Sequence, residues 1–283
     1  MKKSLRLLLF SCLLKTISFS QPGTSTTCVG QLYYSFSHKT DSSIQSDSRF
    51  KETAVLSYGK NLSVYQSHDR IITEQKDAAQ KAEMSTNGNL GVRLYAFGSK
   101  DKYYYIKEKK EIQRIRPFGV PTQLYSMSDK NISINWKIEP EIKQIGNFNC
   151  QKATASFRGR NWTAWFCNDI PFGYGPWMLT GLPGLILEAY DQHREVEFLF
   201  KEINNVAGNI TIAIPQETIS TDEVNFEKVR QAYYESIAFS SGGSITASGS
   251  MNNNNAVSKN KASNKYNNPI DLTSKALRRP YWY

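Results

Sequence analysis

The chain has 283 residues, a formal net charge of +10 and 40% hydrophobic residues. The basic excess is unevenly placed, because residues 1–20 carry +4 and residues 251–283 carry +5, which leaves +1 for residues 21–250. A nucleic-acid-binding protein needs basic residues clustered on a folded surface, so this distribution argues against that class. Beyond the first twenty residues, no segment approaches the run of about twenty apolar residues that a membrane-spanning helix requires.

Residues 1–20 have the pattern of a secretory signal peptide. A basic start precedes the apolar run 7–14, and Ser18 and Ser20 occupy the small-residue positions before a predicted cleavage. A lipoprotein signal acylated at Cys12 is one alternative, but the apolar run before that cysteine is short. A buried N-terminal helix is another, and it would place a lysine on its apolar face. We therefore expect export to the periplasm or cell envelope.

The body, residues 21–239, is expected to form one domain made mostly of short strands. The expected strands are 29–37, two runs within 53–67, 92–97, 102–107, 124–127, 132–138, 141–145, 149–157, 162–166, 185–190, 196–203 and 210–214. Turn residues at 58–61, 98–101 and 191–194 predict hairpins between neighbouring runs. Strands this frequent favour a mainly β fold, an antiparallel curved sheet or half-barrel with one C-terminal helix packed on it. A β-sandwich is the alternative.

Two segments have helical character. Residues 69–85 are charged and rich in Ala and Gln, which predicts a helical insertion near 69–90 with a weak apolar face. Ser220 and Glu223 have the spacing of a capping box and predict a helix over 221–238. Its apolar stripe comprises Phe226, Val229, Tyr233 and Ile237.

The composition changes after this helix. Residues 240–283 are a low-complexity basic tail rich in Asn, Ser and Gly, and such sequence buries too little apolar surface to offset chain entropy. We expect this tail to be disordered and dispensable for folding, with little packing outside 269–272.

A glycine- and proline-rich signature precedes the expected strand 185–190. Gly181 and Gly184 permit unusual backbone angles, while Pro176 and Pro183 restrict the chain, so these four residues predict a rigid turn. The apolar run after Gly184 predicts a strand that is buried on both faces.

The segment 175–191 closely resembles the signature of the GLPGLI family, secreted proteins of Gram-negative bacteria with no settled biochemical role. Similar positions occur at 149–154 and 157–166, and the resemblance is specific over about 136–203. Cys167 departs from the family pattern. The resemblance implies an exported envelope protein, of a kind often found alongside outer-membrane transport receptors.

Three cysteines remain after residue 20. If the hairpin turns at Gly159–Arg160, Cys150 and Cys167 share a face but lie diagonally, roughly 7–8 Å apart. A disulfide prefers Cα atoms within about 4.4–6.8 Å, so a bulge would be needed to bring the two together. The pairing of Cys28, Cys150 and Cys167 therefore stays open at this stage.

Few residues stand out as candidates for chemistry. His193 has Asp191 and Glu195 at alternating positions, which makes the three weak metal candidates, although a turn followed by a strand explains them better. Arg158 and Arg160 beside Trp162 are candidate contacts for a carboxylate or a glycan. No catalytic motif or phosphate loop occurs, so we assign no catalytic residue and no cofactor.

These observations predict a non-catalytic envelope protein that binds an apolar ligand or an outer-membrane protein through its curved sheet. A hydrolase with a dispersed site and a purely structural adaptor are the alternatives. An apolar ligand would require an open cavity of about 300–1,000 Å³ with few polar groups, covered by the helix after Ser220.

Overall fold

The computed structural model describes residues 25–42, 49–87, 97–206, 208, 210–240 and 268–273. The predicted signal peptide and residues 241–267 and 274–283 of the tail lie outside this part. The helices in it are α1 (His68–Asn87) and α2 (Glu223–Ser240). The strands are β1 (Ser25–Thr27), β2 (Gly30–His38), β3 (Phe50–Tyr58), β4 (Leu62–Ser67), β5 (Lys102–Ile106), β6 (Glu111–Phe118), β7 (Gln123–Asp129), β8 (Lys137–Ile145), β9 (Phe148–Phe157), β10 (Arg160–Cys167), β11 (Leu185–Asp191), β12 (Val196–Asn205), β13 (Thr211–Ala213) and β14 (Ile219–Ser220). Neither helix within these ranges has the length and apolarity to cross a membrane.

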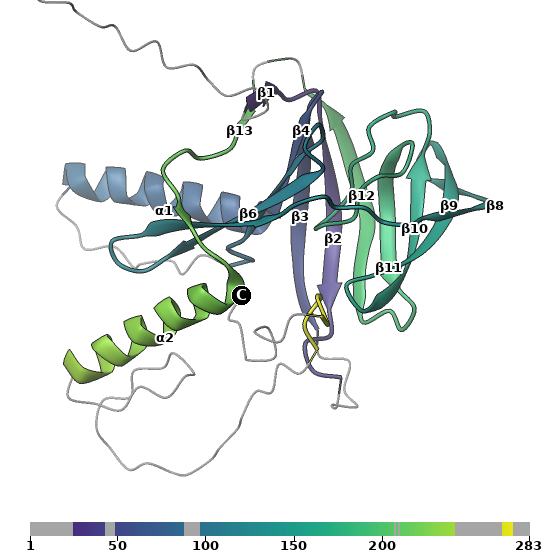
Figure 1. The fold of residues 1–283 in the computed structure, drawn as a ribbon. Helices are drawn as coiled ribbons and strands as arrows, with labels where there is room; N and C mark the ends of the chain where they lie inside the picture. Colours follow the sequence, from purple (N-terminus) through teal and green to yellow (C-terminus); the bar gives the residue numbers. More distant parts are fainter. Residues whose placement is uncertain are drawn as a thin grey trace, which may run out of the picture.

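Twelve strands form one curved, open sheet in the order β14-β7-β6-β5-β4-β3-β2-β12-β11-β10-β9-β8 (Figure 1). Two meanders, β2 to β7 and β8 to β12, join where β2 pairs with β12. The pairs are antiparallel except for β14, which lies parallel to β7. The predicted antiparallel curved sheet is therefore confirmed, and the β-sandwich alternative is wrong because one sheet runs through both halves.

The expected hairpins are partly confirmed. The turns at 58–61 and 191–194 connect β3 to β4 and β11 to β12. The hairpin predicted between 92–97 and 102–107 is wrong, because β5 has β4 on one edge and β6 on the other. Residues 91–96 themselves lie outside the described part.

Two strand predictions need correction. β6 was missed, because its buried residues Ile112 and Ile115 are three apart and do not alternate. The strands expected at 132–138 and 141–145 are one strand, β8, which begins at Lys137 and contains a bulge.

The β9–β10 hairpin turns one residue earlier than predicted. Arg158 and Gly159 have φ of 51° and 77°, and Phe157 pairs with Arg160, as in a two-residue turn with both central residues left-handed. This register places Cys150 directly opposite Cys167 with no bulge between the strands. The diagonal arrangement expected from the sequence is therefore wrong.

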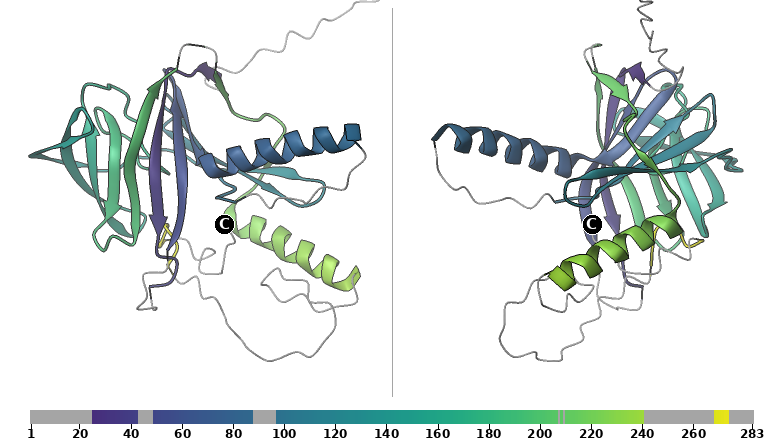
Figure 2. Two further views of the ribbon diagram at one scale, coloured as in Figure 1. Left: turned by 180° about the vertical axis from the view of Figure 1, so that it is seen from behind. Right: turned by 60° about the vertical axis from the view of Figure 1, so that its left-hand side comes forward.

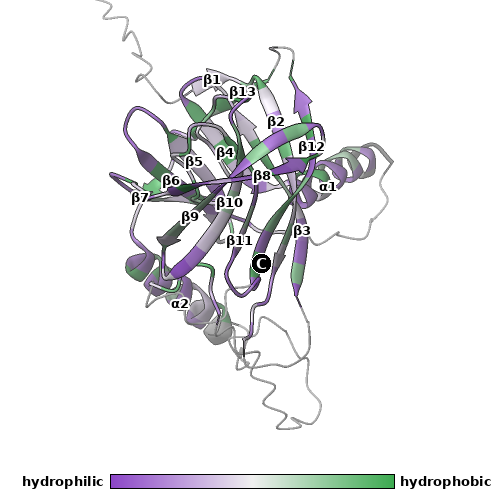
Figure 3. Ribbon diagram, turned by 90° about the vertical axis from the view of Figure 1, so that its right-hand side faces the viewer, coloured by the Kyte–Doolittle hydropathy of each residue, from purple (hydrophilic) through white to green (hydrophobic). Residues whose placement is uncertain are grey.

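The main core covers the inner face of the curved sheet. Alternate residues of β2 point inward, and hydrophobic and hydrophilic residues alternate along the strands (Figure 3). Phe198 of β12 lies near the centre, stacked on Phe36 at 5.0 Å and on Trp162 at 6.1 Å between ring centroids. A smaller core lies on the other face of β4–β6, where Ile212 of β13 helps to cover it.

The signature segment fills the inside of the sheet. Residues 168–184 connect β10 to β11, and their buried side chains Tyr174, Trp177, Leu179 and Leu182 join the main core. The Tyr174 hydroxyl donates to the carbonyl of Lys60 at 3.1 Å, which ties the segment to the β3–β4 turn. The buried strand predicted after Gly184 is confirmed, because residues 185–187 of β11 are fully buried.

The glycines of the signature have distinct roles. Gly181 has φ of 95°, a left-handed conformation that side chains disfavour. Gly184 lies against β10, where an added Cβ would be 1.9 Å from the carbonyl oxygen of Cys167. The backbones of Gly184 and Cys167 therefore lie so close together that no residue with a side chain fits at position 184.

Both helices extend from the β3–β7 half of the sheet, away from β8–β11 (Figures 1 and 2). α1 confirms the predicted helical insertion. α2 packs on β6 and β7 through Phe226, which is 1% exposed. Its expected apolar stripe is only partly correct, because Val229 is 39% exposed.

The start of α2 also differs from the prediction. Asp222 is the N-cap, and its Oδ1 accepts a hydrogen bond from the Asn225 amide at 2.8 Å. Ser220 belongs instead to β14, so the predicted capping box does not form.

Part of the tail packs against the sheet. Residues 268–273, here called the C-terminal strap, are described by the structure, and Asn268 is 4% exposed. The sequence predicts packing in the tail only at 269–272. Asn268 falls just outside that range, yet it is the most buried residue of the strap. A polar residue in a low-complexity context carries no periodic signal that would reveal such burial.

Candidate functional site

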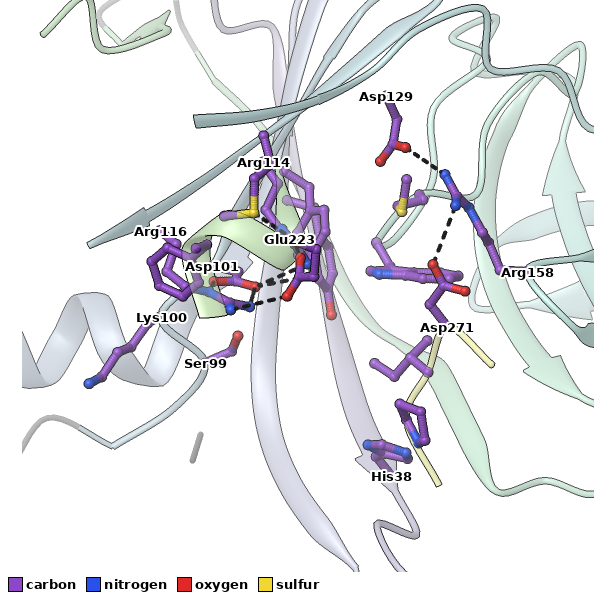
Figure 4. A pocket seen from close by; sticks show the side chains of 18 of the residues that line it. His38, Ser99, Lys100, Asp101, Arg114, Arg116, Asp129, Arg158, Glu223 and Asp271 are labelled. Atoms are coloured by element: carbon purple, nitrogen blue, oxygen red, sulfur yellow. Dashed lines mark hydrogen bonds and ion pairs between the residues drawn. The ribbon is translucent and has the colours of Figure 1, made fainter. Parts of the chain in front are cut away.

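A cavity of about 450 Å³ opens between the inner face of the sheet, α2 and the C-terminal strap. Its lining comes from segments far apart in the sequence, from β2 near the start to the strap near the end (Figure 4). Ligand pockets typically measure about 300–1,000 Å³, so the size suits a small molecule. We take this cavity as the candidate functional site.

The floor of the cavity is apolar. It is formed by side chains of the main core and its margin, which are largely buried beneath the surface. The aromatic members are Phe36, Tyr65, Tyr103, Trp177 and Phe198. Phe118 and Phe226, whose rings are 5.6 Å apart, extend this surface toward α2.

Trp177 reaches the floor through an unusual backbone conformation. Its φ is 55°, in the left-handed region that costs a bulky residue roughly 1–2 kcal/mol. Contacts with Trp162 at 5.8 Å and Phe157 at 6.0 Å between ring centroids hold it there. The signature segment therefore supplies part of the cavity floor at the expense of local strain.

One wall is a cluster of ion pairs between the β5–β7 arm and α2. Arg116 donates to both oxygens of Asp101, and Arg114 pairs with Glu223. Burial acts to raise the pKa of Asp101, but the charges of Arg116 and Arg114 and the Arg116 hydrogen bonds together hold that pKa below its ordinary value. Asp101 is therefore ionised and fixed.

Glu223 contributes further ion pairing to this wall. Its Oε1 is buried and lies 3.7 Å from Nη1 of Arg116, within ion-pair distance, although it accepts no hydrogen bond. The carboxylate of Glu223 is therefore enclosed by the two arginines, Arg114 and Arg116.

The opposite wall centres on Arg158, at the β9–β10 turn. Its guanidinium lies 2.8 Å from Asp129 of β7 and 3.4 Å from Asp271 of the strap. Figure 4 shows these contacts on the side away from the Asp101 cluster. Arg158 thus joins three separate segments at the edge of the cavity.

The strap is held below this wall by buried polar contacts. Arg160, 4% exposed, donates to Asn268 Oδ1 at 2.5 Å, to the Pro269 carbonyl at 2.8 Å and to the Ile270 carbonyl at 3.0 Å. The same guanidinium pairs with Asp191 at 2.7 Å. The strap therefore closes one side of the cavity through a fully desolvated arginine.

His38 also contacts the strap. Its Nε2 lies 2.7 Å from the carbonyl oxygen of Asn268, which makes this nitrogen the proton donor. Burial, together with the charges of Arg160 and Arg49, lowers the pKa of His38 to about 3, although its bond to Asn268 opposes the shift. The imidazole is therefore neutral at neutral pH.

A buried carboxyl lies at the β3 side of the cavity. Glu52 accepts a hydrogen bond from the Ser99 amide at 2.8 Å. Burial raises its pKa, and the nearby Asp69 adds to the effect, while bonds from Ser67 and Ser99 oppose it. Among the described lining residues this carboxyl is the clearest candidate for proton transfer.

The structure places the site residues predicted from the sequence in different parts of the molecule. Arg158 lines the cavity. Arg160 and Trp162 do not, because Arg160 is enclosed behind the strap and Trp162, 1% exposed, belongs to the core. Of the signature positions, Pro176, Gly181, Pro183 and Gly184 shape the segment that carries Trp177 and Met178 into the cavity.

The weak metal candidates are not assembled as a site. Asp191 and Glu195 both pair with Arg160, while His193 is exposed in the turn and contacts Gln192. Within the described ranges, no group of three metal-ligating side chains has the geometry to hold an ion.

Sequence reasoning missed most of the cavity wall. Asp101, Arg114 and Arg116 lie on or beside β6, the strand whose spacing is irregular. The two arginines on either side of Ile115 were the available signal, since a strand would place Arg114 and Arg116 on one face and Ile115 on the other. Glu223 was noted only for capping.

A second, more open depression of about 780 Å³ lies at the far end of β12. Phe148, Phe172 and Phe200 line it, together with Asp169 and Lys201. It has fewer converging charged groups than the cavity beneath α2, so it is the weaker candidate.

Comparison with known proteins gives limited information. A family model described as a protein of unknown function (Porph_ging) matches residues 158–188, which include the signature. A search of curated proteins finds no match. Two solved structures of PNGF-II, in the P21 and C2 space groups, are similar at 12% identity with TM-scores of 0.47 and 0.49. Each alignment covers 73% of this chain but only 34% and 33% of those chains, so the chain spans about a third of their length. The chain is thus similar, over its signature, to a family without an assigned function.

Proposed function

We propose that this chain is an exported, non-catalytic binding protein of the cell envelope, which takes a small ligand with an apolar body into the cavity beneath α2. The observation that carries the proposal is the combination of an aromatic floor with walls whose arginines are already paired with carboxylates.

The wall charges favour a ligand without net charge. Five cationic and six acidic side chains line the cavity, and its arginines contact carboxylates at close range. An anionic ligand would have to compete with these carboxylates for the same guanidinium groups. An uncharged ligand leaves every ion pair intact and gains from the apolar floor.

The polar residues of the cavity walls add one requirement. Carboxylates, guanidinium groups and serine hydroxyls stand beside the aromatic floor, so a wholly apolar ligand would desolvate polar groups without giving them a partner. We therefore propose a neutral amphipathic ligand with an apolar body and at least one polar group. This differs from the sequence-based expectation of a cavity with few polar groups.

The family and location belong to the same proposal. The match at 158–188 coincides with the segment that resembles the GLPGLI family, so we propose membership of that family, with export to the periplasm or outer-membrane surface. The resemblance then implies an accessory role beside an outer-membrane receptor, with the bound ligand as its cargo.

A hydrolase is the second candidate, and Glu52 is the observation that favours it. Its raised pKa and its position in the cavity lining suit a general acid. However, Glu52 already accepts bonds from Ser67, which directly precedes α1, and from the Ser99 amide, which precedes β5, and these bonds indicate a structural role. Binding explains the aromatic floor more directly.

Mass spectrometry of molecules extracted from the protein after purification from its native envelope tests the proposal. We expect a neutral amphipathic compound at a stoichiometry near one, displaced by the neutral dye N-phenyl-1-naphthylamine. Ser99→Trp fills the cavity beside Glu52, and it should weaken dye binding at least tenfold. Ser156→Trp, on the exposed side of β9, is the matched control and should leave binding unchanged. Equal dye affinity in both variants would place binding elsewhere and reject the proposal.

A further inference from the structure

The β9–β10 register brings two cysteines into direct opposition. Cys150 pairs with Cys167, and the strands run without a bulge from the turn to this pair. Both side chains are fully buried, and the Cys150 thiol is a hydrogen-bond partner of the Cys167 thiol. Cys28, the remaining cysteine in the described ranges, belongs to the separate core under β1 and β13.

The type of strand pair suits a cross-link. Phe157 and Arg160 close a two-residue turn and are therefore a hydrogen-bonded pair. Pairs alternate along an antiparallel ladder, so Cys150 and Cys167, seven steps away, form a non-hydrogen-bonded pair. Such pairs have Cα atoms about 4.5 Å apart, within the range of about 4.4–6.8 Å for disulfides.

The backbone of Cys167 agrees with this assignment. Its carbonyl oxygen faces away from β9, since it accepts a hydrogen bond from Ile170 at 3.4 Å and lies against Gly184. In a non-hydrogen-bonded pair the backbone groups point away from the partner strand in this way.

We propose that Cys150 and Cys167 form a cross-strand disulfide when the chain folds in the presence of a disulfide oxidant such as glutathione disulfide. The Cys150 thiolate attacks one oxidant sulfur, forming a mixed disulfide and releasing one thiolate. The Cys167 thiolate then attacks the Cys150 sulfur, closes the Cys150–Cys167 bond and releases the second thiolate. The two protons lost by the cysteines go to the two released thiolates. The net result is that two electrons pass from the cysteines to the oxidant, which is reduced to two thiols.

The timing follows from burial. Burial is the main factor that raises the pKa of Cys150 to about 12 in the folded protein, which leaves almost no thiolate there. The two-residue hairpin is local in sequence and exposes both thiols until β8, β11 and the signature segment pack on it. Oxidation therefore occurs during folding, and the finished fold protects the bond.

The disulfide would anchor the signature segment at its starting point. Residues 168–184 leave the sheet directly after Cys167 and return at Gly184, which rests on the Cys167 carbonyl. A bond at Cys167 fixes both ends of this connection to β9. The inference is independent of what the cavity binds.

Peptide mapping of the full chain tests the proposal. The unfolded, reduced protein is folded in a mixture of reduced and oxidised glutathione, denatured with an alkylating agent and digested with trypsin. Cleavage separates Cys150, in peptide 144–152, from Cys167, in peptide 161–194. We expect most of the protein to yield these two peptides linked. Recovery of mostly alkylated single peptides, or linkage to Cys28, would overturn the proposal.

A stability measurement separates the bond from packing effects. The chain-entropy model for a loop of this length predicts that reductant lowers the Tm of the oxidised protein by roughly 6–12 °C. Cys28→Ala should retain the reductant effect, while Cys150→Ala/Cys167→Ala should lose it, whatever its absolute Tm. A reductant effect that persists in the double variant would refute the assignment. As a second check, reduced protein that is already folded should oxidise more than tenfold slower than the refolding chain.

Discussion

Removal of the Asn268 side chain should destabilise the protein, although the residue lies in a tail that the sequence marks as dispensable. Its Oδ1 accepts from Arg160 at 2.5 Å, and its Nδ2 donates to the Lys39 carbonyl at 2.7 Å and to Glu195 at 2.9 Å. The Asn268 residue is 4% exposed and Arg160 has almost no access to water. Asn268→Ala therefore leaves buried donors and acceptors without partners.

The size of the effect follows from these contacts. A hydrogen bond to a charged group contributes about 1.5–3 kcal/mol, and a buried unsatisfied polar group costs about 1–3 kcal/mol. Because the contacts share one network, they do not add fully, and we expect a loss of about 2–4 kcal/mol. At this chain length each kcal/mol corresponds to roughly 2–4 °C in Tm.

Urea unfolding followed by tryptophan fluorescence measures this loss. Asn204→Ala, an exposed position on β12, is the matched control and should change the free energy of unfolding by less than about 0.5 kcal/mol. Truncation after Ser240 removes the whole strap and should cost at least as much as Asn268→Ala. A midpoint for Asn268→Ala equal to that of the control would show that the strap docks without contributing to stability, and the reasoning would fail.

Three further predictions concern the body of the protein. Leu187→Ala, at a fully buried position of β11, should lower the free energy of unfolding by about 2–5 kcal/mol, while Ile142→Ala, at a 60% exposed position, should change it little in the same urea titration. Gly184→Ala should abolish cooperative thermal unfolding or cost more than Leu187→Ala, because its Cβ would meet a backbone carbonyl at 1.9 Å; a normal melting curve would contradict the close approach. The pKa of His38 is lowered from 6.5 to about 3 in the folded state, so the unfolded chain takes up a proton first as pH falls. Its contribution to stability is complete above pH 6.5 and declines by about 1.4 kcal/mol per pH unit below it, down to about pH 3. His38→Gln should flatten the decline between pH 6.5 and 5, and His193→Gln, at an exposed position, should not; identical slopes would exclude His38 as the source.

The elements that the sequence predicts correctly are those encoded by local chemistry. Turn residues at 58–61 and the uninterrupted apolar run of β11 each depend on neighbouring residues, so a pattern reveals them. β6 escapes the same reasoning because Ile112 and Ile115 lie three apart. The register of the β9–β10 hairpin depends on where its turn lies. Placing the turn one residue too late moves Cys150 and Cys167 out of direct opposition.

The candidate site was largely out of reach of local patterns. Its walls combine Asp101 and Arg114 with Glu223, which lies more than a hundred positions further along the chain and meets them only in the folded structure. Asn268 is buried against Arg160, which is also more than a hundred positions away in the chain. Such contacts have no period in the sequence, whereas Arg158 was found because a charged residue stands at a hairpin turn beside tryptophans.

The seam between the two meanders has a consequence for biosynthesis. β2 pairs on one side with β3, which follows it closely, but on the other side with β12, and Ser37 and Glu197 at this seam are 160 residues apart. The first meander must therefore emerge from the ribosome with one long edge of β2 unpaired until the second meander has been made. Unpaired edges are templates for aggregation, and pairing between distant segments is slow. Productive folding of this protein thus depends on shielding that edge during synthesis, a requirement that a chaperone acting on the nascent chain would meet.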